Sequence, residues 1–389
     1  MKLGCLLSAL LIPALVVGQV DIFGYFESEF DHITVSDRGY NYGYNKLRLD
    51  LDHSGIDGAT FGANVNIQKY YGNVKWNMLD FFPNEIWEPI FQPLGIEEFP
   101  FAVADTLYLD NAYVRLHFNK GDLTIGKQQI SLGVGYAWNP LDIFNTKLLL
   151  DPTYEQTGVN GFRIEIPVKD RANVDFIISP GSDWKNSTKM ITGKLGLGRF
   201  DLIGTIGSYN WKRTQLDLRT FQSQYLNLER IMAGGAIVGE IGGIGIWGEG
   251  AYNTLKDAEN YTELLVGFDY TFENGLYCLA EFYHNGNSPE KFNALDLNNY
   301  LQYLNGETHS LLQNYTFIIW QYPLSDFVSI GMINFANLSD KSAALNPQLE
   351  WNAFEDVSIS FLFGYYMGDE NTEFGLQEWN GRIRMRAYF

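Results

Sequence analysis

The last eleven residues, 379–389, read Trp-Asn-Gly-Arg-Ile-Arg-Met-Arg-Ala-Tyr-Phe. Successive side chains of a strand point to opposite faces, so the alternating apolar residues from Gly381 to Phe389 would share one face. The reverse face would carry Arg382, Arg384 and Arg386. An apolar face suits hydrocarbon and a cationic face suits a water-filled lumen. The segment therefore predicts a strand of a transmembrane β-barrel in a bacterial outer membrane, with the lipid bilayer as its main partner.

The amino terminus is typical of a secretory signal. Lys2 is followed by an apolar run from Leu6 to Val17, and that run is shorter than the roughly 20 residues of a membrane-spanning helix. We expect residues 1–18 to be a removed signal peptide and residues 19–389 to form the barrel. Cys278 would then be the only cysteine of the mature chain, which excludes an intramolecular disulfide.

Composition and charge narrow the class of protein. Aromatic residues make up 15% of the chain, and 39 glycines against 12 prolines suit many strands and turns. The net charge of −19 makes nucleic acid an unexpected partner. No stretch approaches eighteen consecutive apolar residues, so the sequence does not predict helical membrane spans.

Tight turns alternate with long connections along the chain. Compact turns recur at eight places, for example at Gly242-Gly243 and Glu273-Asn274-Gly275. The longer connections are expected at residues 71–106, 132–158, 212–228 and 285–311. A sheet in hydrocarbon must close to satisfy its backbone groups, so we expect an all-β antiparallel barrel of about 18 strands, with short periplasmic turns and long extracellular loops. A soluble propeller or sandwich is the alternative, but it leaves this alternation unexplained.

Strand parity selects the residues that would line the pore. In the first strand, Phe26 and Phe30 would face lipid, which leaves Glu27 and Glu29 inside. Closure would bring these glutamates near the arginines of the last strand. Further inward cations are expected on other strands: Lys46, Arg48, Arg115 and Arg163. Two interpretations remain open, a charge-compensated wall at the seam or an electrostatic track for an acidic solute.

The loop 71–106 is rich in large aromatic residues, including Trp76 and Trp87. These rings must pack somewhere, either over the pore as a constriction or among themselves as an extracellular cap. Loop 285–311 has Leu297, Leu301 and Leu304 at helical spacing and poses the same choice. Aromatic residues near strand ends, such as Trp211, are expected in the interfacial girdles.

The middle of the chain carries a Gly-Lys-Gln segment at residues 126–128, an Asn-Pro-Leu-Asp-Ile-Phe segment at residues 139–144 and a Gly-Val pair at residues 158–159. These segments resemble porin-like proteins related to alginate exporters. In that family a strand ending in Gly-Arg-Gln enters a Gly-rich loop with Asn-Pro-x-Asp-x-Phe, and a Gly-Val strand follows. Here Gly126-Lys127-Gln128 stands for the first element, residues 139–144 fit the second, and Gly158-Val159 begins the third. The resemblance covers about a tenth of the chain and implies an eighteen-stranded barrel whose loops narrow the pore, with Asn139 and Asp142 in such a loop.

Lys127 departs from that pattern, since an ammonium lacks the planar guanidinium fork that binds anions bidentately. By parity Lys127 shares a face with Ile125, so it points inward only if a bulge intervenes. Phe389 is also similar to the terminal aromatic residue by which outer-membrane barrels are recognised, and the barrel-assembly machinery is therefore an expected partner.

The sequence favours a channel over an enzyme. The histidines are scattered and no catalytic or metal-binding spacing is present, so no cofactor and no metal are expected. The expected function is a porin-like channel for small hydrophilic solutes, with acidic sugars or organic anions favoured. The alternatives are an exopolysaccharide export channel and a structural or adhesive surface barrel.

Overall fold

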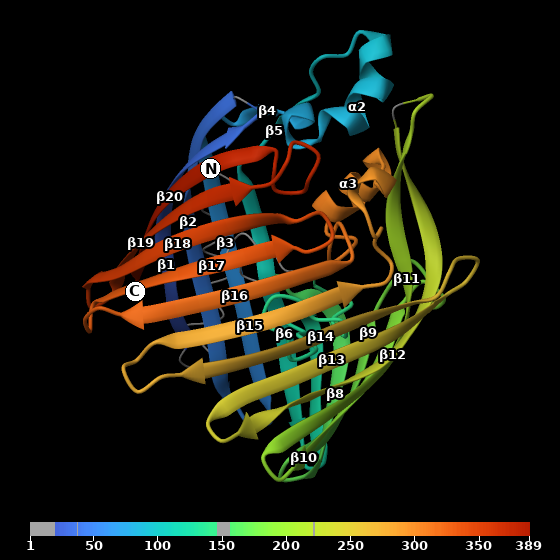
Figure 1. Ribbon diagram of the computed structural model, residues 1–389. Coiled ribbons are helices and arrows are strands. Elements are labelled where there is room, and N and C mark those ends of the chain that lie inside the picture. The colour runs from blue at the N-terminus through green and yellow to red at the C-terminus, as the bar shows by residue number, and fades with distance from the viewer. Residues whose placement is uncertain (1–19, 37, 146–155, 221) are drawn as a thin grey trace, which may run out of the picture.

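The computed structural model describes residues 20–36, 38–145, 156–220 and 222–389, and these form a closed antiparallel β-barrel (Figure 1). Within these ranges eighteen strands join one sheet, and the first strand pairs with the last to close it. The expected barrel of about eighteen strands is confirmed. The expected signal peptide, residues 1–18, lies outside the described residues.

The barrel strands follow one another around the wall in chain order. Their bounds are β1 Asp21–Val35, β2 Arg38–Ile56, β3 Ala59–Gly72, β6 Thr106–Phe118, β7 Gly121–Gln128, β8 Val159–Lys169, β9 Ala172–Ser179, β10 Thr188–Leu197, β11 Phe200–Asp217, β12 Gln222–Ile241, β13 Ile244–Leu255, β14 Tyr261–Thr271, β15 Tyr277–Asn285, β16 Asn314–Pro323, β17 Val328–Asn337, β18 Ser342–Phe354, β19 Val357–Met367 and β20 Gln377–Tyr388.

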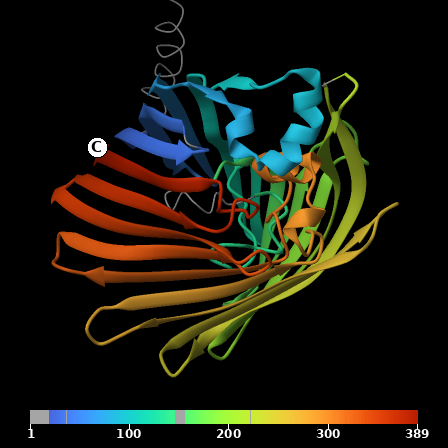
Figure 2. The same ribbon diagram turned by 45° about the horizontal axis from the view of Figure 1, so that its top comes forward.

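The remaining elements belong to two long loops at one rim, as Figure 2 shows. The loop between β3 and β6 holds a small sheet of β4 (Lys75–Asn77) and β5 (Pro100–Ala102). The same loop contains three helices, η1 Met78–Phe81, α2 Asn84–Phe91 and η2 Gln92–Leu94. The loop between β15 and β16 contains η3 Phe292–Ala294 and the predicted helix α3, Leu297–Leu304. Among the described residues, no helix has the length and apolar character needed to span a membrane.

The two ends of the barrel differ in the length of their connections. Across the described ranges, eight connections at one end are tight, and the predicted turns account for them. Gly242 and Gly243, between β12 and β13, have φ of 61° and 85°, the left-handed pair that a two-residue hairpin turn requires. The prediction of a long loop at residues 212–228 was wrong. β11 and β12 remain paired residue by residue from Trp211↔Leu228 to Asp217↔Gln222, so the two strands extend as a hairpin beyond their expected ends.

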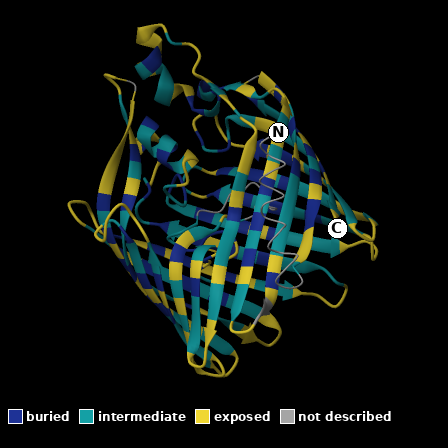
Figure 3. Cartoon of the chain, turned by 180° about the vertical axis from the view of Figure 1, so that it is seen from behind, coloured by how far each residue is buried: buried dark blue, intermediate teal, exposed yellow. Residues whose placement is uncertain are grey.

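Burial alternates along the strands, as the banding in Figure 3 shows. In β1 the side chains of Glu27 and Glu29 are buried, whereas Phe26 and Phe30 are 39% and 45% exposed. Ile383 of β20 is exposed on the same outer side as Phe30, with which it pairs. The outside of the barrel is thus apolar and its inside is polar, the arrangement of a barrel that spans a bilayer.

An apolar core lies inside the barrel, at the foot of the long loops. It joins Phe82 and Phe91 of the β3–β6 loop to Leu297 and Tyr300 of α3. Wall residues on β15–β17, such as Phe335, complete this core. The loops therefore pack into the lumen instead of projecting freely from the rim.

Candidate functional site

A loop that folds into the lumen is the first part of the candidate site. We call residues 129–145, between β7 and β8, the inward loop. Leu141 is fully buried, and the indole of Trp138 stacks on the ring of Tyr283 on β15 with centroids 5.0 Å apart. Apolar residues of the loop also pack on Met232 of β12 and Ala251 of β13. The inward loop therefore covers the inner wall on this side of the barrel.

Asn139 and Asp142, implied by the family resemblance, both lie in the inward loop and are buried. The backbone N–H of Asp142 donates to the carbonyl oxygen of Asn139 at 3.0 Å. The Asp142 carboxylate accepts the N–H groups of Phe144 and Asn145 at 3.0 and 3.2 Å. These contacts fold the Asn-Pro-x-Asp-x-Phe segment into a compact turn, so both residues shape the loop.

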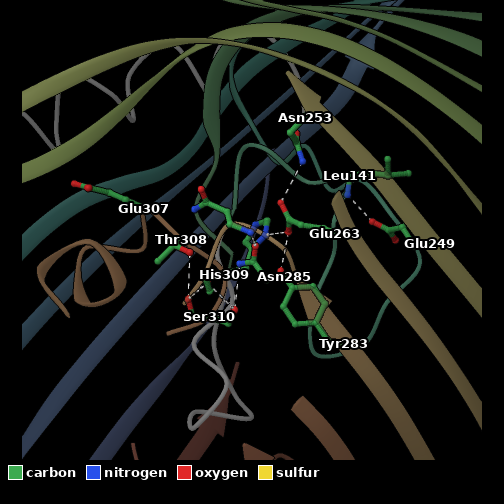
Figure 4. Close-up of polar contacts among 12 residues, drawn as sticks. Leu141, Glu249, Asn253, Glu263, Tyr283, Asn285, Glu307, Thr308, His309 and Ser310 are labelled. Atoms are coloured by element: carbon green, nitrogen blue, oxygen red, sulfur yellow. Dashed lines mark hydrogen bonds and ion pairs between the residues drawn. The ribbon is translucent and has the colours of Figure 1, made fainter. Parts of the chain in front are cut away.

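A cavity of about 150 Å³ opens between the inward loop, the strands β11, β12, β14 and β15, and the loop that carries α3. At its base, the Glu263 carboxylate contacts His309 Nδ1 at 2.7 Å and accepts a hydrogen bond from the Tyr283 hydroxyl at 2.7 Å (Figure 4). The guanidinium of Arg230 lies 3.3 Å from Glu263 and donates through Nε to Asn253 at 2.9 Å. One buried carboxylate thus joins an arginine and a histidine beside the cavity.

Aromatic rings enclose the arginine of this cavity. The Arg230 guanidinium lies 5.0–5.1 Å from the ring centroids of Tyr209, Trp211 and Tyr261, within the range of cation–π attraction. The prediction that Trp211 belongs to an interfacial girdle was therefore wrong, since its side chain is buried inside. Arg230 was not among the pore residues expected from the sequence, although Ile231 and Met232 beside it give a parity signal, since Ile231 is exposed and Met232 is buried on the same side as Arg230.

His309 lies in the loop between α3 and β16, and the Glu263 carboxylate determines its charge. Burial alone would lower the pKa of His309, but the Glu263 carboxylate at 2.7 Å outweighs burial and raises the pKa above its ordinary value. The imidazolium form is therefore favoured beside the cavity.

The closing seam forms a second group of charges, and the structure brings the expected residues together there. The register pairs Glu27 with Arg386, Glu29 with Arg384 and Asp31 with Arg382. Arg386 Nη2 lies 2.6 Å from Glu27 and Arg382 Nε lies 2.7 Å from Asp31, while Arg384 contacts Glu29 directly. Tyr44 of β2 donates its hydroxyl to Glu27 at 2.8 Å. The seam is a ladder of ion pairs.

Other expected cations lie along the neighbouring strands. The guanidinium of Arg48 contacts Asp50 at 2.9 Å and Asp110 at 3.7 Å. The ammonium of Lys46 lies 5.4 Å from the ring centroid of Tyr25. These two side chains continue the seam onto β2.

Arg115 and Arg163 lie farther around the wall, on β6 and β8. Arg163 contacts Asp175 at 2.6 Å, and Arg115 contacts Glu165 at 3.8 Å. Lys127 of β7 lies in a register without a bulge, so it shares the outer face with Ile125, and its ammonium donates to the carbonyl oxygen of Leu109 at 2.7 Å. It does not join the inner cations.

The aromatic residues of the β3–β6 loop divide between two places, the end of β2 and the apolar core inside the barrel. The Trp76 ring stacks on Phe81 with centroids 5.4 Å apart and lies 5.5 Å from Tyr40 of β2. Trp87 of α2 donates its indole N–H to Asn84 within the same helix at 3.2 Å. Trp76 therefore packs on the end of β2, whereas Trp87 packs against the apolar core inside the barrel.

Metal ligation has no geometric support in the described part of the chain. There, no group of three or more His, Cys, Asp or Glu side chains is placed to hold a metal ion.

Comparison with known proteins identifies the fold. No family model and no curated protein matches the sequence. Among solved structures, OpdQ of Pseudomonas aeruginosa has a TM-score of 0.59 at 8% identity, over 96% of this chain and 99% of that one. OccAB3 of Acinetobacter baumannii has a TM-score of 0.57 at 9% identity, over 95% and 99%. OccK2 of P. aeruginosa, in complex with glucuronate, has a TM-score of 0.56 at 8% identity, over 95% and 98%.

These neighbours are outer-membrane β-barrel porins, and the chain shares their fold. None of the three is an alginate exporter by its description.

Proposed function

We propose that the protein is an outer-membrane channel for small hydrophilic solutes, with acidic sugars or organic anions as the favoured class. The observation that carries this proposal is the layering of charge on the inner wall. In several ion pairs the carboxylate lies deep and the guanidinium lies above it. A solute in the lumen would therefore meet cations first, although each pair is close to neutral.

The exposed fractions of the paired side chains give the layering. Arg386 is 18% exposed above Glu27 at 2%, and Arg382 is 19% exposed above Asp31 at 4%. Arg163 repeats the pattern at 24% above Asp175 at 4%. Because a carboxylate on a solute can accept hydrogen bonds from the outward edge of a guanidinium, this layering favours anionic solutes over cationic ones.

The cavity beside the inward loop supplies a narrower contact point. Arg230 and His309 are both hydrogen-bond donors there, and the rings of Tyr209 and Trp211 form an apolar wall. Aromatic faces with polar donors suit a ring-shaped solute that carries hydroxyl or carboxylate groups. The glucuronate in the OccK2 structure is a solute of this class, bound by that protein.

Reconstitution into planar bilayers tests the proposal. Wild-type protein should conduct, and its reversal potential in a salt gradient should report a preference for anions. Changing Arg382, Arg384 and Arg386 to Gln should shift the reversal potential toward cations, most strongly at low salt, because salt screens such charges over about 8–10 Å. Absence of conductance in correctly folded protein would refute the channel, and unchanged selectivity at low salt would refute the arginine surface.

Export of a secreted polysaccharide is the second candidate. Two observations support it. Residues 122–145 and 158–166 resemble porin-like proteins related to alginate exporters, and the motif at residues 139–144 of that resemblance lies in the inward loop, where a solute would pass. Block of the current by acidic oligosaccharides, and not by the corresponding monosaccharide, would favour export. The reverse order of potency would favour uptake of small solutes.

A further inference from the structure

Two buried glutamates of the barrel wall hold the inward loop. Glu249 lies on β13 and Glu281 on β15, with β14 between them, and their side chains are only 4% and 3% exposed. Neither was among the pore residues expected from the sequence. Both contact backbone N–H groups of the inward loop.

Glu249 binds N–H groups on both sides of the loop turn and uses both carboxylate oxygens. Val134 N–H donates to Oε2 at 2.7 Å and Leu141 N–H donates to Oε1 at 2.5 Å, the second contact being visible in Figure 4. Because these donors are seven positions apart in the chain, one carboxylate fixes both sides of the loop turn.

Glu281 binds the segment between those two points. Tyr136 N–H donates to Oε1 at 2.5 Å and Ala137 N–H donates to Oε2 at 2.7 Å. The Trp247 indole N–H, from β13, also donates to Oε1 at 2.7 Å. The carboxylate is therefore oriented by the wall and binds the loop with both oxygens.

The glycines of the loop make this approach sterically possible. Gly133 has φ of 86°, and a Cβ added there would lie 2.5 Å from the Glu249 carboxylate. A Cβ at Gly135 would lie 1.9 Å from the backbone oxygen of Trp138. The Gly-Val-Gly segment thus lets the backbone come close enough for its N–H groups to reach the wall.

We propose that Glu249 and Glu281 are positioning residues that set the width of the passage by holding the inward loop against the β13–β15 wall. The inference rests on the proposed channel function. Hydrogen bonds to a charged acceptor are stronger than neutral ones, and a loop bound at residues 134, 136, 137 and 141 has little freedom to move across the lumen. Loss of these acceptors should let the loop shift and change the free cross-section.

The test uses Gln and Asp at each position separately, so that one carboxylate always remains. Gln keeps the length but presents an amide N–H to the loop N–H groups, while Asp keeps the charge and falls short by one methylene. In both variants of either residue, we expect larger uncharged sugars to enter liposomes and single-channel conductance to rise. A size limit unchanged from wild type in all four variants would overturn the proposal, as would an effect of Gln without any effect of Asp.

A second readout does not depend on conduction. Hydrogen exchange at the N–H groups of residues 134–141 should become faster in the same variants, whereas the β1–β20 seam should keep its protection. Trp247→Phe is a milder variant, because it removes one donor to Glu281 and leaves both carboxylates in place. We expect it to shift the exchange rates in the same direction by less.

The two readouts separate the possible failures. Faster exchange with an unchanged size limit would show that the glutamates hold the loop without setting the width, and this would overturn the proposal. Unchanged exchange would overturn the holding role itself. Wild-type protein that does not conduct would instead refute the channel function, and the exchange data would still report on the loop.

Discussion

Glu27 of the first strand and Arg386 of the last lie opposite each other in the register that closes the barrel, with 2.6 Å between Oε2 and Nη2. Glu27 is 2% exposed and also accepts the Tyr44 hydroxyl. The Arg386 guanidinium in turn lies 4.4 Å from the ring centroid of Tyr25. The contact therefore joins charge, hydrogen bonding and aromatic packing at the one place where the two ends of the sheet meet.

Removal of Arg386 should destabilise the closed barrel. Arg386→Gln leaves the buried Glu27 carboxylate with the longer contact to Arg384 at 3.7 Å, and breaking a buried pair from one side costs up to about 3–5 kcal/mol. We expect the temperature at which the barrel loses its heat-modifiable mobility on gels to fall. The double variant Glu27→Gln, Arg386→Gln should recover part of that loss, since no uncompensated charge remains. A double variant less stable than the sum of the two single variants would contradict this account.

The topology predicts which rim faces outward. With Cys278 changed to Ser, a cysteine at Glu88 on α2 should be labelled by a membrane-impermeant reagent on intact cells, because the long loops are expected to be extracellular. A cysteine at Asn274, in the tight turn between β14 and β15, should be labelled only after the outer membrane is opened. The opposite pattern would invert the orientation.

Neutralising Glu263 should make the anion preference depend on pH. Glu263→Gln removes the negative charge between Arg230 and His309, and it also removes the carboxylate that raises the pKa of His309, so two cations face the cavity together only at a pH low enough to protonate His309. At such a pH and at low salt the reversal potential of the variant should move toward anions, whereas at neutral pH it should change little. Thermal stability should fall because buried donors lose a charged acceptor. Glu240→Gln, at an exposed position near the end of β12, changes the net charge equally and serves as the control. An equal shift in both variants would exclude a local effect.

The loop between β19 and β20 should loosen as pH rises. Burial raises the pKa of Glu373 in this loop from 4.5 to about 7, and the Tyr315 hydroxyl at 2.5 Å counteracts burial only in part. Because the folded pKa is the higher one, the stabilising effect is complete below about 4.5 and is lost as pH rises through about 7. Hydrogen exchange of residues 368–376, corrected for its intrinsic pH dependence, should show this change.

Several other groups surround Glu373, and the control must separate them. Asn337 and Tyr303 donate to the carboxylate, Asp340 raises its pKa further, and His309 lines the same small cavity. Glu373→Gln keeps the acceptor oxygen but has no titrating proton, so its exchange should not vary across this pH range. A variant that retained the full pH dependence would assign the effect to His309 or Asp340.

The strands and the seam were predictable because a two-residue period is a local property of the sequence. Residues 379–389 and Phe26 to Phe30 alternate so regularly that their inner faces, and the meeting of arginines with glutamates, follow from parity and closure. The eight tight turns were predictable for the same reason, since glycine, asparagine, aspartate or serine marks each of them locally. The hairpin at residues 212–228 was missed because its outer half alternates less clearly between apolar and polar residues.

The interior of the lumen was less predictable because its contacts are distant in sequence. Glu249 binds an N–H group 108 positions away in the chain, and Glu281 binds one 144 positions away. No local sequence pattern predicts either contact. The composition of loop 71–106 predicts that its aromatic residues are packed, but composition alone does not distinguish an extracellular cap from a constriction of the pore. The glycines at 133 and 135 were the available signal for a close backbone approach, and only the structure shows what they approach.

The seam also has a consequence for how the barrel is made. Arg386 and Glu27 are 359 positions apart, so the contact that completes the sheet is among the most non-local in the chain. Loops of that length cost entropy to close, and folds dominated by distant pairings form slowly. Until β20 reaches β1, both strands are unpaired edges whose N–H and C=O groups are open to any other strand. The open sheet is therefore more exposed to aggregation than the closed one, and the ion pairs between β1 and β20 favour the one register in which each arginine meets a carboxylate.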